Sequence, residues 1–217
     1  MKTARLITKS RVPPSDVHEE LCIRFVNTVA WRLRDPVEDR VKTTTALLDW
    51  FAAAGVADAS FAARLRARWE THPREEEAFR KSAVRLREAI YQILLSQIDG
   101  KAFDRSALNI LNAATAVQVR GLGIAPSKGG LAWRSDKRYS AADDLLRPIA
   151  WSAVGLLMGP RFGKVRQCQD ERGCGWLFVD ESRAQNRRWC SMGDCGNRAK
   201  VLRHYHRHAS RESASSR

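Results

Sequence analysis

The sequence of 217 residues lacks the signatures of several large protein classes. It has no run of the roughly 18 uncharged apolar residues that a membrane-spanning helix needs, so we expect no membrane partner. Its first residues lack the apolar stretch and cleavage site of a secretory signal, which favours a cytoplasmic location. No Walker loop, GxGxxG motif, Ser/His/Asp set or close pair of acids is present, so the sequence predicts no enzyme.

Acidic residues are scarce relative to basic ones. The chain has 24 Asp and Glu against 38 Lys and Arg, a formal net charge of +14 and a pI near 10.3. Residues 161–217 carry half of this net charge in about a quarter of the length. Such charge attracts polyanions, of which nucleic acid is the commonest that a basic cytoplasmic protein meets. A generally basic proteome is the alternative explanation.

The first 160 residues read as a helical domain. A helix is predicted over 18–32, and later helices have clear start signals at Thr43, Asp58, Pro73 and Asp104. Alternating steps of four and three mark the buried face of the helix that begins at Pro73. That face comprises Phe79, Ala83, Leu86, Ile90 and Ile93.

A small β-hairpin and a last helix complete this domain. Residues 116–124 and 129–135 are rich in β-branched and aromatic residues around a Gly/Pro/Ser turn, which predicts the hairpin. Ser140 and Asp143 form a candidate capping box for a helix over 141–158, which ends at Gly159. We therefore expect a mainly α fold with a helical domain over 1–160, a small metal-binding domain over 161–209, and a disordered tail over 210–217.

Four of the five cysteines lie close together near the C-terminus. They are Cys168, Cys174, Cys190 and Cys195, two close pairs separated by fifteen residues. Each pair can form a turn that offers two thiolates, which is the arrangement that tetrahedral Zn²⁺ requires. Four thiolates leave no open position for water, so the expected zinc is structural. One histidine among 204, 206 and 208 as a substitute ligand, or unligated buried cysteines, are the alternatives.

The residues around these cysteines predict a treble-clef-like finger. Residues 175–180 alternate as a strand, and a turn at 182–186 leads to residues 187–190, so we expect a hairpin between the two cysteine pairs. Asp194 is the expected N-cap of a following helix that contains Cys195. Such a small module buries too little apolar surface to fold alone, whereas zinc binding contributes on the order of 10–16 kcal/mol.

Two segments resemble a known bacterial family. The stretch from CGWLFVD through RRWCSM to CGNRAK is similar to the CGNR zinc fingers, and LCIRFVNTVAWR at 21–32 is similar to the start of the helical ABATE domain that precedes such fingers. The resemblance implies a stress-associated bacterial transcription regulator, with the four clustered cysteines as zinc ligands.

A basic face on the last helix is the candidate nucleic-acid contact. At 100° per residue Lys200, Arg203 and Arg207 fall together, while Val201, Leu202 and Tyr205 form an apolar side expected to pack on the finger. A merely solvated face is the alternative. Arg183, Arg187 and Arg188 near the turn are further candidates for phosphate contacts. Arg198 is expected to be structural and to pair with Asp180 or with carbonyls of the first cysteine pair, and Trp176 and Trp189 to flank the zinc.

The helical domain is expected to sense a small-molecule effector or to form a homodimer. Asn27, Thr28 and Trp31 could line a small pocket, although such side chains more often satisfy local backbone groups. The favoured function is a transcription regulator whose finger presents a basic helix to DNA. The alternatives are a zinc-stabilised module that binds a protein of the transcription machinery and, less favoured, a zinc enzyme, which would need an open metal position.

Overall fold

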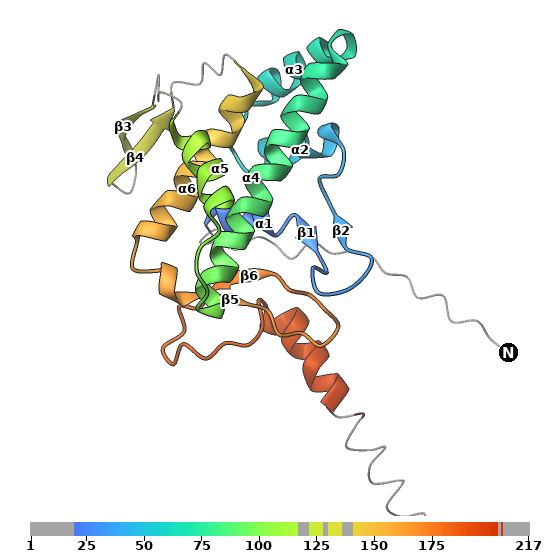
Figure 1. The fold of residues 1–217 in the computed structure, drawn as a ribbon, viewed down its shortest axis with the longest axis vertical. Helices are drawn as coiled ribbons and strands as arrows, with labels where there is room; N and C mark the ends of the chain where they lie inside the picture. Colours follow the sequence, from blue (N-terminus) through green and yellow to red (C-terminus); the bar gives the residue numbers. More distant parts are fainter. Residues whose placement is uncertain (1–19, 117–121, 128–129, 136–140, 204, 206–217) are drawn as a thin grey trace, which may run out of the picture.

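A computed structural model describes residues 20–116, 122–127, 130–135, 141–203 and 205. As expected, the fold is mainly α (Figure 1). The first part of the chain contains α1 (Leu21–Val26), β1 (Val29–Ala30), β2 (Glu38–Asp39), α2 (Thr44–Ala53), α3 (Ala59–Thr71), α4 (Pro73–Asp99) and α5 (Arg105–Ala116). The second contains β3 (Leu122–Ser127), β4 (Gly130–Ser135), η1 (Ala142–Leu146), α6 (Arg147–Met158), η2 (Phe162–Lys164), β5 (Val165–Gln167), β6 (Leu177–Val179) and η3 (Met192–Gly196).

Most predicted helix ends are where their capping residues place them. The side chain of Thr43 accepts a hydrogen bond from the Ala46 amide, and that of Asp58 from the Phe61 amide. Gly100 ends α4 in the left-handed conformation, at φ 64°, which costs glycine little. The β3–β4 hairpin is also confirmed.

The start of α6 has a carboxylate cap and a turn that the sequence did not predict. The Asp144 carboxylate accepts a hydrogen bond from the Ala141 amide, and one turn of 3-10 helix precedes α6. The predicted capping box of Ser140 and Asp143 stays a prediction. Ser140 lies outside the described residues. No helix in the described segments is long and apolar enough to cross a membrane.

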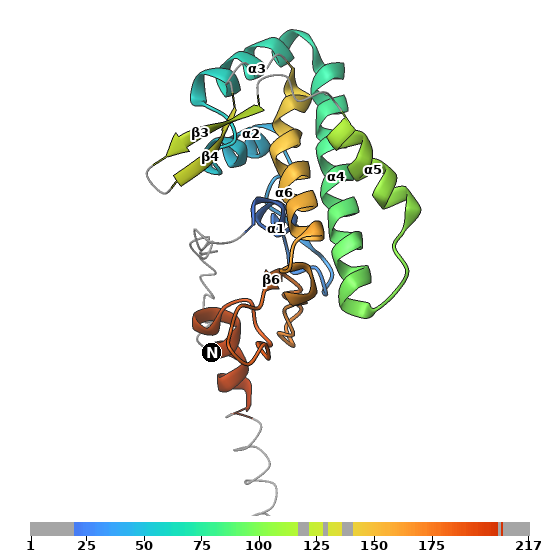
Figure 2. The same ribbon diagram turned by 90° about the vertical axis from the view of Figure 1, so that its left-hand side faces the viewer.

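The long helix α4 forms the axis of the helical part. Helices α1, α3 and α5 contact it, and α6 lies beside α1 and α5 (Figure 2). Its predicted apolar stripe is buried throughout. Near its start Phe79 packs against Trp69, with ring centroids 5.3 Å apart, and against Phe51 of α2. These contacts join α2, α3 and α4 in one core.

The first helix is much shorter than the predicted 18–32. It ends at Val26, because Thr28 turns its hydroxyl to the Phe25 carbonyl and Asn27 directs its amide to another strand. Side chains that compete for backbone groups in this way favour helix ends. The chain then forms β1, which pairs antiparallel with β2 and leaves a connecting loop over 31–37, the β1–β2 loop.

A buried arginine fixes the β1–β2 pair to α4. Arg87 is 3% exposed and forms ion pairs with Asp39 and Glu88, while Arg32 forms a second one with Glu88. Burial alone would raise the pKa of the Asp39 carboxyl, but the hydrogen bonds and charge of Arg87 outweigh it and lower that pKa. The buried guanidinium therefore keeps a charged partner at neutral pH.

The strand 177–179 pairs with a partner that the sequence did not predict. It forms an antiparallel pair with β5, with Val165 opposite Val179, and not with residues 187–190. Val165 and Leu177 are fully buried in the main helical core. The first cysteine pair thus lies in the loop of a hairpin that the helical core holds, and the boundary expected near residue 160 is crossed by a continuous core.

Asn27 clamps this hairpin to α1. Its side-chain amide donates to the Leu177 carbonyl at 2.8 Å and its oxygen accepts from the Leu177 amide at 2.9 Å, so it replaces one residue of a neighbouring strand. Leu177 is fully buried, and Asn27 is buried with 7% of its surface exposed.

The variant Asn27→Ala leaves the donor and acceptor of Leu177 unpaired inside the core. We expect the free energy of unfolding to fall by about 2–4 kcal/mol, measured by urea denaturation. Asn109→Ala, at an exposed position of α5, is the matched control and should change stability little. Equal stability of the two variants would contradict the clamp.

Candidate metal centre and nucleic-acid interface

The four clustered cysteines meet at one point. The Sγ atoms of Cys168, Cys174, Cys190 and Cys195 all lie within 4.8 Å of one another. Two of the separations are 3.8 Å, between Cys174 and Cys190, and 3.6 Å, between Cys190 and Cys195. The fifth cysteine, Cys22, is buried in the helical core, where burial raises its thiol pKa to about 12.

This geometry fits tetrahedral zinc. Zn–S bonds of about 2.3 Å place tetrahedral sulfurs about 3.8 Å apart. The four thiols interact strongly with one another. Hydrogen bonds from its neighbours, above all Cys174, lower the pKa of the Cys168 thiol. Contact with Cys168 raises the pKa values of the Cys190 and Cys195 thiols. A divalent cation would allow all four to be thiolates. All four ligands come from the protein, so the site fits a structural metal.

The first knuckle, residues 168–174, is shaped by glycines. Gly173 and Gly175 flank Cys174 with φ values of 88° and 66°. A Cβ on Gly175 would lie 2.8 Å from Leu33 Cγ, and one on Gly173 would lie 3.0 Å from Arg34 Cβ. Only glycine therefore allows the β1–β2 loop to approach the knuckle this closely.

The β1–β2 loop is bonded directly to the first knuckle. The Arg32 amide donates to the Cys174 carbonyl and the Leu33 amide to the Gly173 carbonyl, each at 3.1 Å. The indole of Trp176 donates to the Val29 carbonyl, also at 3.1 Å. The metal centre is therefore attached to the helical part by backbone contacts next to a ligand, which the sequence did not reveal.

The second knuckle, residues 190–195, leads into a helix that starts earlier than expected. A π-helical turn begins at Met192, preceded by Ser191 in extended conformation, and residues 197–203 continue as α-helix. We call residues 192–203 the C-terminal helix. Cys195 lies inside its first turn, so Asp194 is not the N-cap. The wider turn directs the Cys195 sulfur toward the other ligands.

Arg198 is structural, as predicted, but its partner is Asp170 and not Asp180. Its guanidinium bonds to Asp170 at 2.9 Å and to Asp194, and donates to the Cys195 sulfur at 2.9 Å. Burial opposes its charge, yet Cys195 and the two carboxylates raise its pKa above the ordinary value. Asp180 instead accepts from Ser182 and from the Arg187 amide, and so shapes the following loop.

Three tryptophans surround the cysteines. Trp176 and Trp189 pack against the cluster as predicted, and Trp31 of the β1–β2 loop joins them. Trp31 is therefore a metal-site residue, and the structure separates it from Asn27 and Thr28. The side chains of Asn27 and Thr28 form hydrogen bonds with the backbone, and the Thr28 hydroxyl also accepts one from Arg87. Their predicted role in a ligand pocket stays a prediction.

The predicted nucleic-acid residues are mostly exposed around the second knuckle. Arg183, Arg188, Lys200 and Arg203 are exposed, and among the described side chains none of them forms an ion pair. Arg187 is half-buried, since it lies over the Phe178 ring and donates to the Cys190 carbonyl. Arg207, the three C-terminal histidines and the predicted disordered tail lie outside the described residues.

One expectation about the C-terminal helix is wrong. Val201 is 55% exposed, so it does not pack on the finger as expected, and Tyr205 is 69% exposed. The half-buried side chains are Arg198, Ala199 and Leu202. The reason is that Arg198 and its carboxylate partners take the place on the finger that the apolar side was expected to fill.

Comparison with family profiles agrees with this architecture. A profile described as "ABATE: Putative stress-induced transcription regulator" matches residues 19–160, more than half of the chain. The chain belongs to the ABATE family. A second profile, the CGNR zinc finger, matches residues 164–208 and contains the four-cysteine site. A search of curated proteins found no match. The ABATE region therefore supplies α1 to α6, and its β1–β2 loop contacts the zinc finger.

Removal of zinc is expected to unfold the finger but not the ABATE core. The finger cluster contains only three cysteines and Phe178 as buried apolar residues, whereas β5 and β6 are anchored in the main core. Elemental analysis should find one zinc per chain. After chelation, hydrogen exchange should accelerate at Cys168 and Gly196, while Ile90 in α4 stays protected. Unchanged protection at Cys168 and Gly196 in metal-free protein would contradict this.

Arg198→Ala should destabilise the finger specifically. It leaves Asp170, whose side chain is 2% exposed, as an uncompensated buried charge, a loss on the order of 3 kcal/mol. We expect faster zinc loss to a chelator, followed with a colorimetric zinc indicator. Arg198→Lys retains the charge but not the paired bonds, so it should recover only part of the resistance. Wild-type rates of zinc loss in both variants would exclude this role.

Proposed function

We propose that the protein is a DNA-binding transcription regulator. Its zinc finger holds the C-terminal helix so that basic residues face double-stranded DNA, and the zinc is structural. The observation that carries this proposal is the exposed set of Arg183, Arg188, Lys200 and Arg203, none of which forms an ion pair with a described side chain, beside the four-cysteine centre. Membership of a family described as transcription regulators supports it.

The proposed location is the cytoplasm. We propose no catalytic activity, because four protein thiolates complete the coordination of zinc.

The helical ABATE region is proposed to sense an effector or to form a homodimer. A shallow hollow at the start of α4 is lined by Pro73, Arg74, Glu77, Ala78 and Lys81. It is open and mostly made of surface side chains, so it does not itself identify an effector.

A second candidate function is binding to a protein of the transcription machinery. It is favoured by the exposed apolar side chains of the C-terminal helix, of which Met192 is 48% and Val201 55% exposed. Apolar side chains at the centre of a surface are typical of protein contacts. Their basic surroundings favour DNA over this candidate, since charged residues are depleted at the centre of protein interfaces.

DNA binding is expected to depend strongly on salt. Neutralising three to five phosphates gives a slope of log K against log salt of about −3 to −5. The triple variant Lys200→Ala, Arg203→Ala, Arg207→Ala should lose binding to duplex DNA, measured by fluorescence anisotropy, and keep its zinc. Arg64→Ala, Arg74→Ala, Arg85→Ala, with exposed arginines of α3 and α4, is the charge-matched control and should bind normally. A flat salt response, or equal binding by both triple variants, would overturn the DNA proposal.

A further inference from the structure

One flank of the C-terminal helix carries arginines that come from other parts of the chain. The sequence analysis did not select these arginines. The ring of Trp31 lies beside Arg198, whose guanidinium carbon is 5.3 Å from the ring centroid. Arg34 of the β1–β2 loop and Arg172 of the first knuckle lie over the same ring, at 4.2 and 5.9 Å. One indole ring is therefore in contact with cations from the ABATE region, the first knuckle and the C-terminal helix.

Two of these three arginines have no acidic partner among the residues that the structure describes. Arg198 is neutralised by Asp170 and Asp194. Arg34 and Arg172 are exposed, and in the described part of the chain neither forms an ion pair. The acids next to them in sequence, Asp35 and Glu171, are exposed and have no ion pair either.

A second tryptophan forms a similar flank on the other side of the helix. Arg188 and Arg203 lie over Trp189, at 5.5 and 5.8 Å from its centroid. Arg198 and Arg203 are separated by five residues, which is about 140° around an α-helix. Trp31 and Trp189 therefore lie on two different sides of the C-terminal helix, and both pack against the cysteine cluster.

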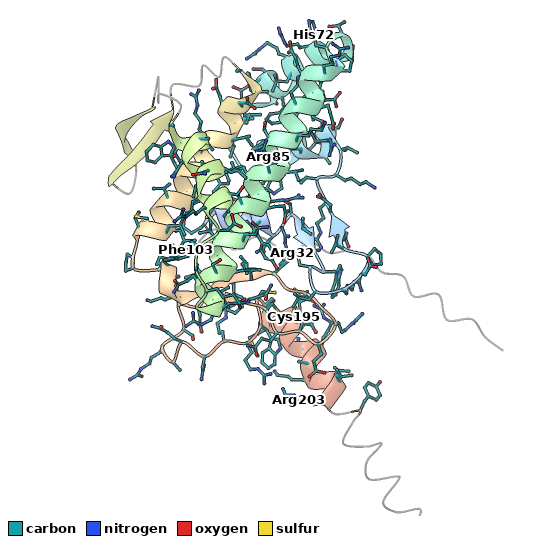
Figure 3. All side chains as sticks on the ribbon, viewed as in Figure 1. Arg32, His72, Arg85, Phe103, Cys195 and Arg203 are labelled. Atoms are coloured by element: carbon teal, nitrogen blue, oxygen red, sulfur yellow. The ribbon has the colours of Figure 1, made fainter. Side chains whose placement is uncertain are left out.

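The face of the C-terminal helix that points away from the finger, between these two sides, is exposed. Ala199 and Leu202 are half-buried and lie on the side toward the finger, while Asn197, Lys200 and Val201 are exposed on the opposite side. Figure 3 shows the helix leaving the finger from Cys195 toward Arg203, away from the helical part. The helix thus presents a ridge of three residues with cations on both of its flanks.

This arrangement matches the major groove of DNA. The groove is about 12 Å wide and admits one helix, so the phosphates of the two strands lie on either side of an inserted helix. Cations on one flank reach only one strand. We propose that Arg34 and Arg172 contact the phosphates of the strand opposite the one that Arg188 and Arg203 contact. The ABATE region is thereby part of the DNA interface.

The β1–β2 loop is positioned firmly enough for this role. Its backbone bonds to Cys174 and Gly173, and Arg32 at its base is paired with Glu88 of α4. The positions of Arg34 and Arg172 are therefore fixed relative to the zinc site, and little order has to be gained on binding. This inference rests on the proposed function, because the anion is the phosphate backbone of the same duplex.

The test is DNA binding by the zinc-loaded full chain across a series of salt concentrations. The double variant Arg34→Ala, Arg172→Ala should bind mixed-sequence duplex DNA more weakly than wild type, and its salt slope should be shallower by about 1.8 for two lost phosphate contacts. Arg64→Ala, Arg74→Ala removes the same charge from the opposite end of the molecule and should leave the slope unchanged (Figure 1). The charge-retaining variant Arg34→Lys, Arg172→Lys should restore the wild-type slope.

The outcomes distinguish this inference from the proposed function. If wild-type protein binds DNA and the Lys200, Arg203, Arg207 triple variant does not, but the Arg34, Arg172 double variant matches its control, the DNA contact of Arg34 and Arg172 is refuted and the proposed function stands. If wild-type protein shows no salt-dependent binding, both fall. Zinc content and urea denaturation of the double variant show whether the finger is intact, so a loss of binding with an intact finger supports the inference.

Discussion

The convergence of four sulfur atoms on one tetrahedral site is the constraint on which the C-terminal part of this protein depends. Cys168 and Cys174 belong to a hairpin that the helical core already holds, whereas Cys190 and Cys195 belong to a segment with few buried apolar contacts of its own. A metal that joins the two pairs therefore transfers the rigidity of the core to the C-terminal helix. Arg198 adds to this, because it connects the helix to Asp170 in the first knuckle and to the Cys195 sulfur.

The helical region and the start of the zinc finger share a continuous core. Leu177 is buried in the main core, Asn27 completes its hydrogen bonds, and Gln167 donates to the Tyr91 hydroxyl of α4 at 2.8 Å. A finger on a flexible tether would be oriented independently of the domain before it. Here the orientation of the C-terminal helix is set by α1, α4 and the β1–β2 loop, so any ligand or partner that shifts these elements would also shift the helix.

Tryptophan has a specific use at this centre. Trp31 and Trp189 cover the cysteine cluster with apolar surface and also hold arginines over their faces. The same rings thus shield part of the cysteine cluster from water and arrange positive charge around the helix. The two roles of these tryptophans explain how a small finger combines a partly buried metal site with a strongly basic surface.

The sequence by itself determined the helices with strong caps and the ligand set. Thr43, Asp58, Pro73 and Gly100 act on neighbouring backbone groups, and the cysteine spacing is set by the chemistry of one ion, so local information was sufficient. Tertiary structure decided the rest: the end of α1 at Val26, the partner of strand 177–179, the pairing of Arg198 with Asp170, and the place of Trp31 at the metal centre. Each depends on a residue far away in the chain, and the close approach of the β1–β2 loop to Gly173 and Gly175 is likewise visible only in the folded chain.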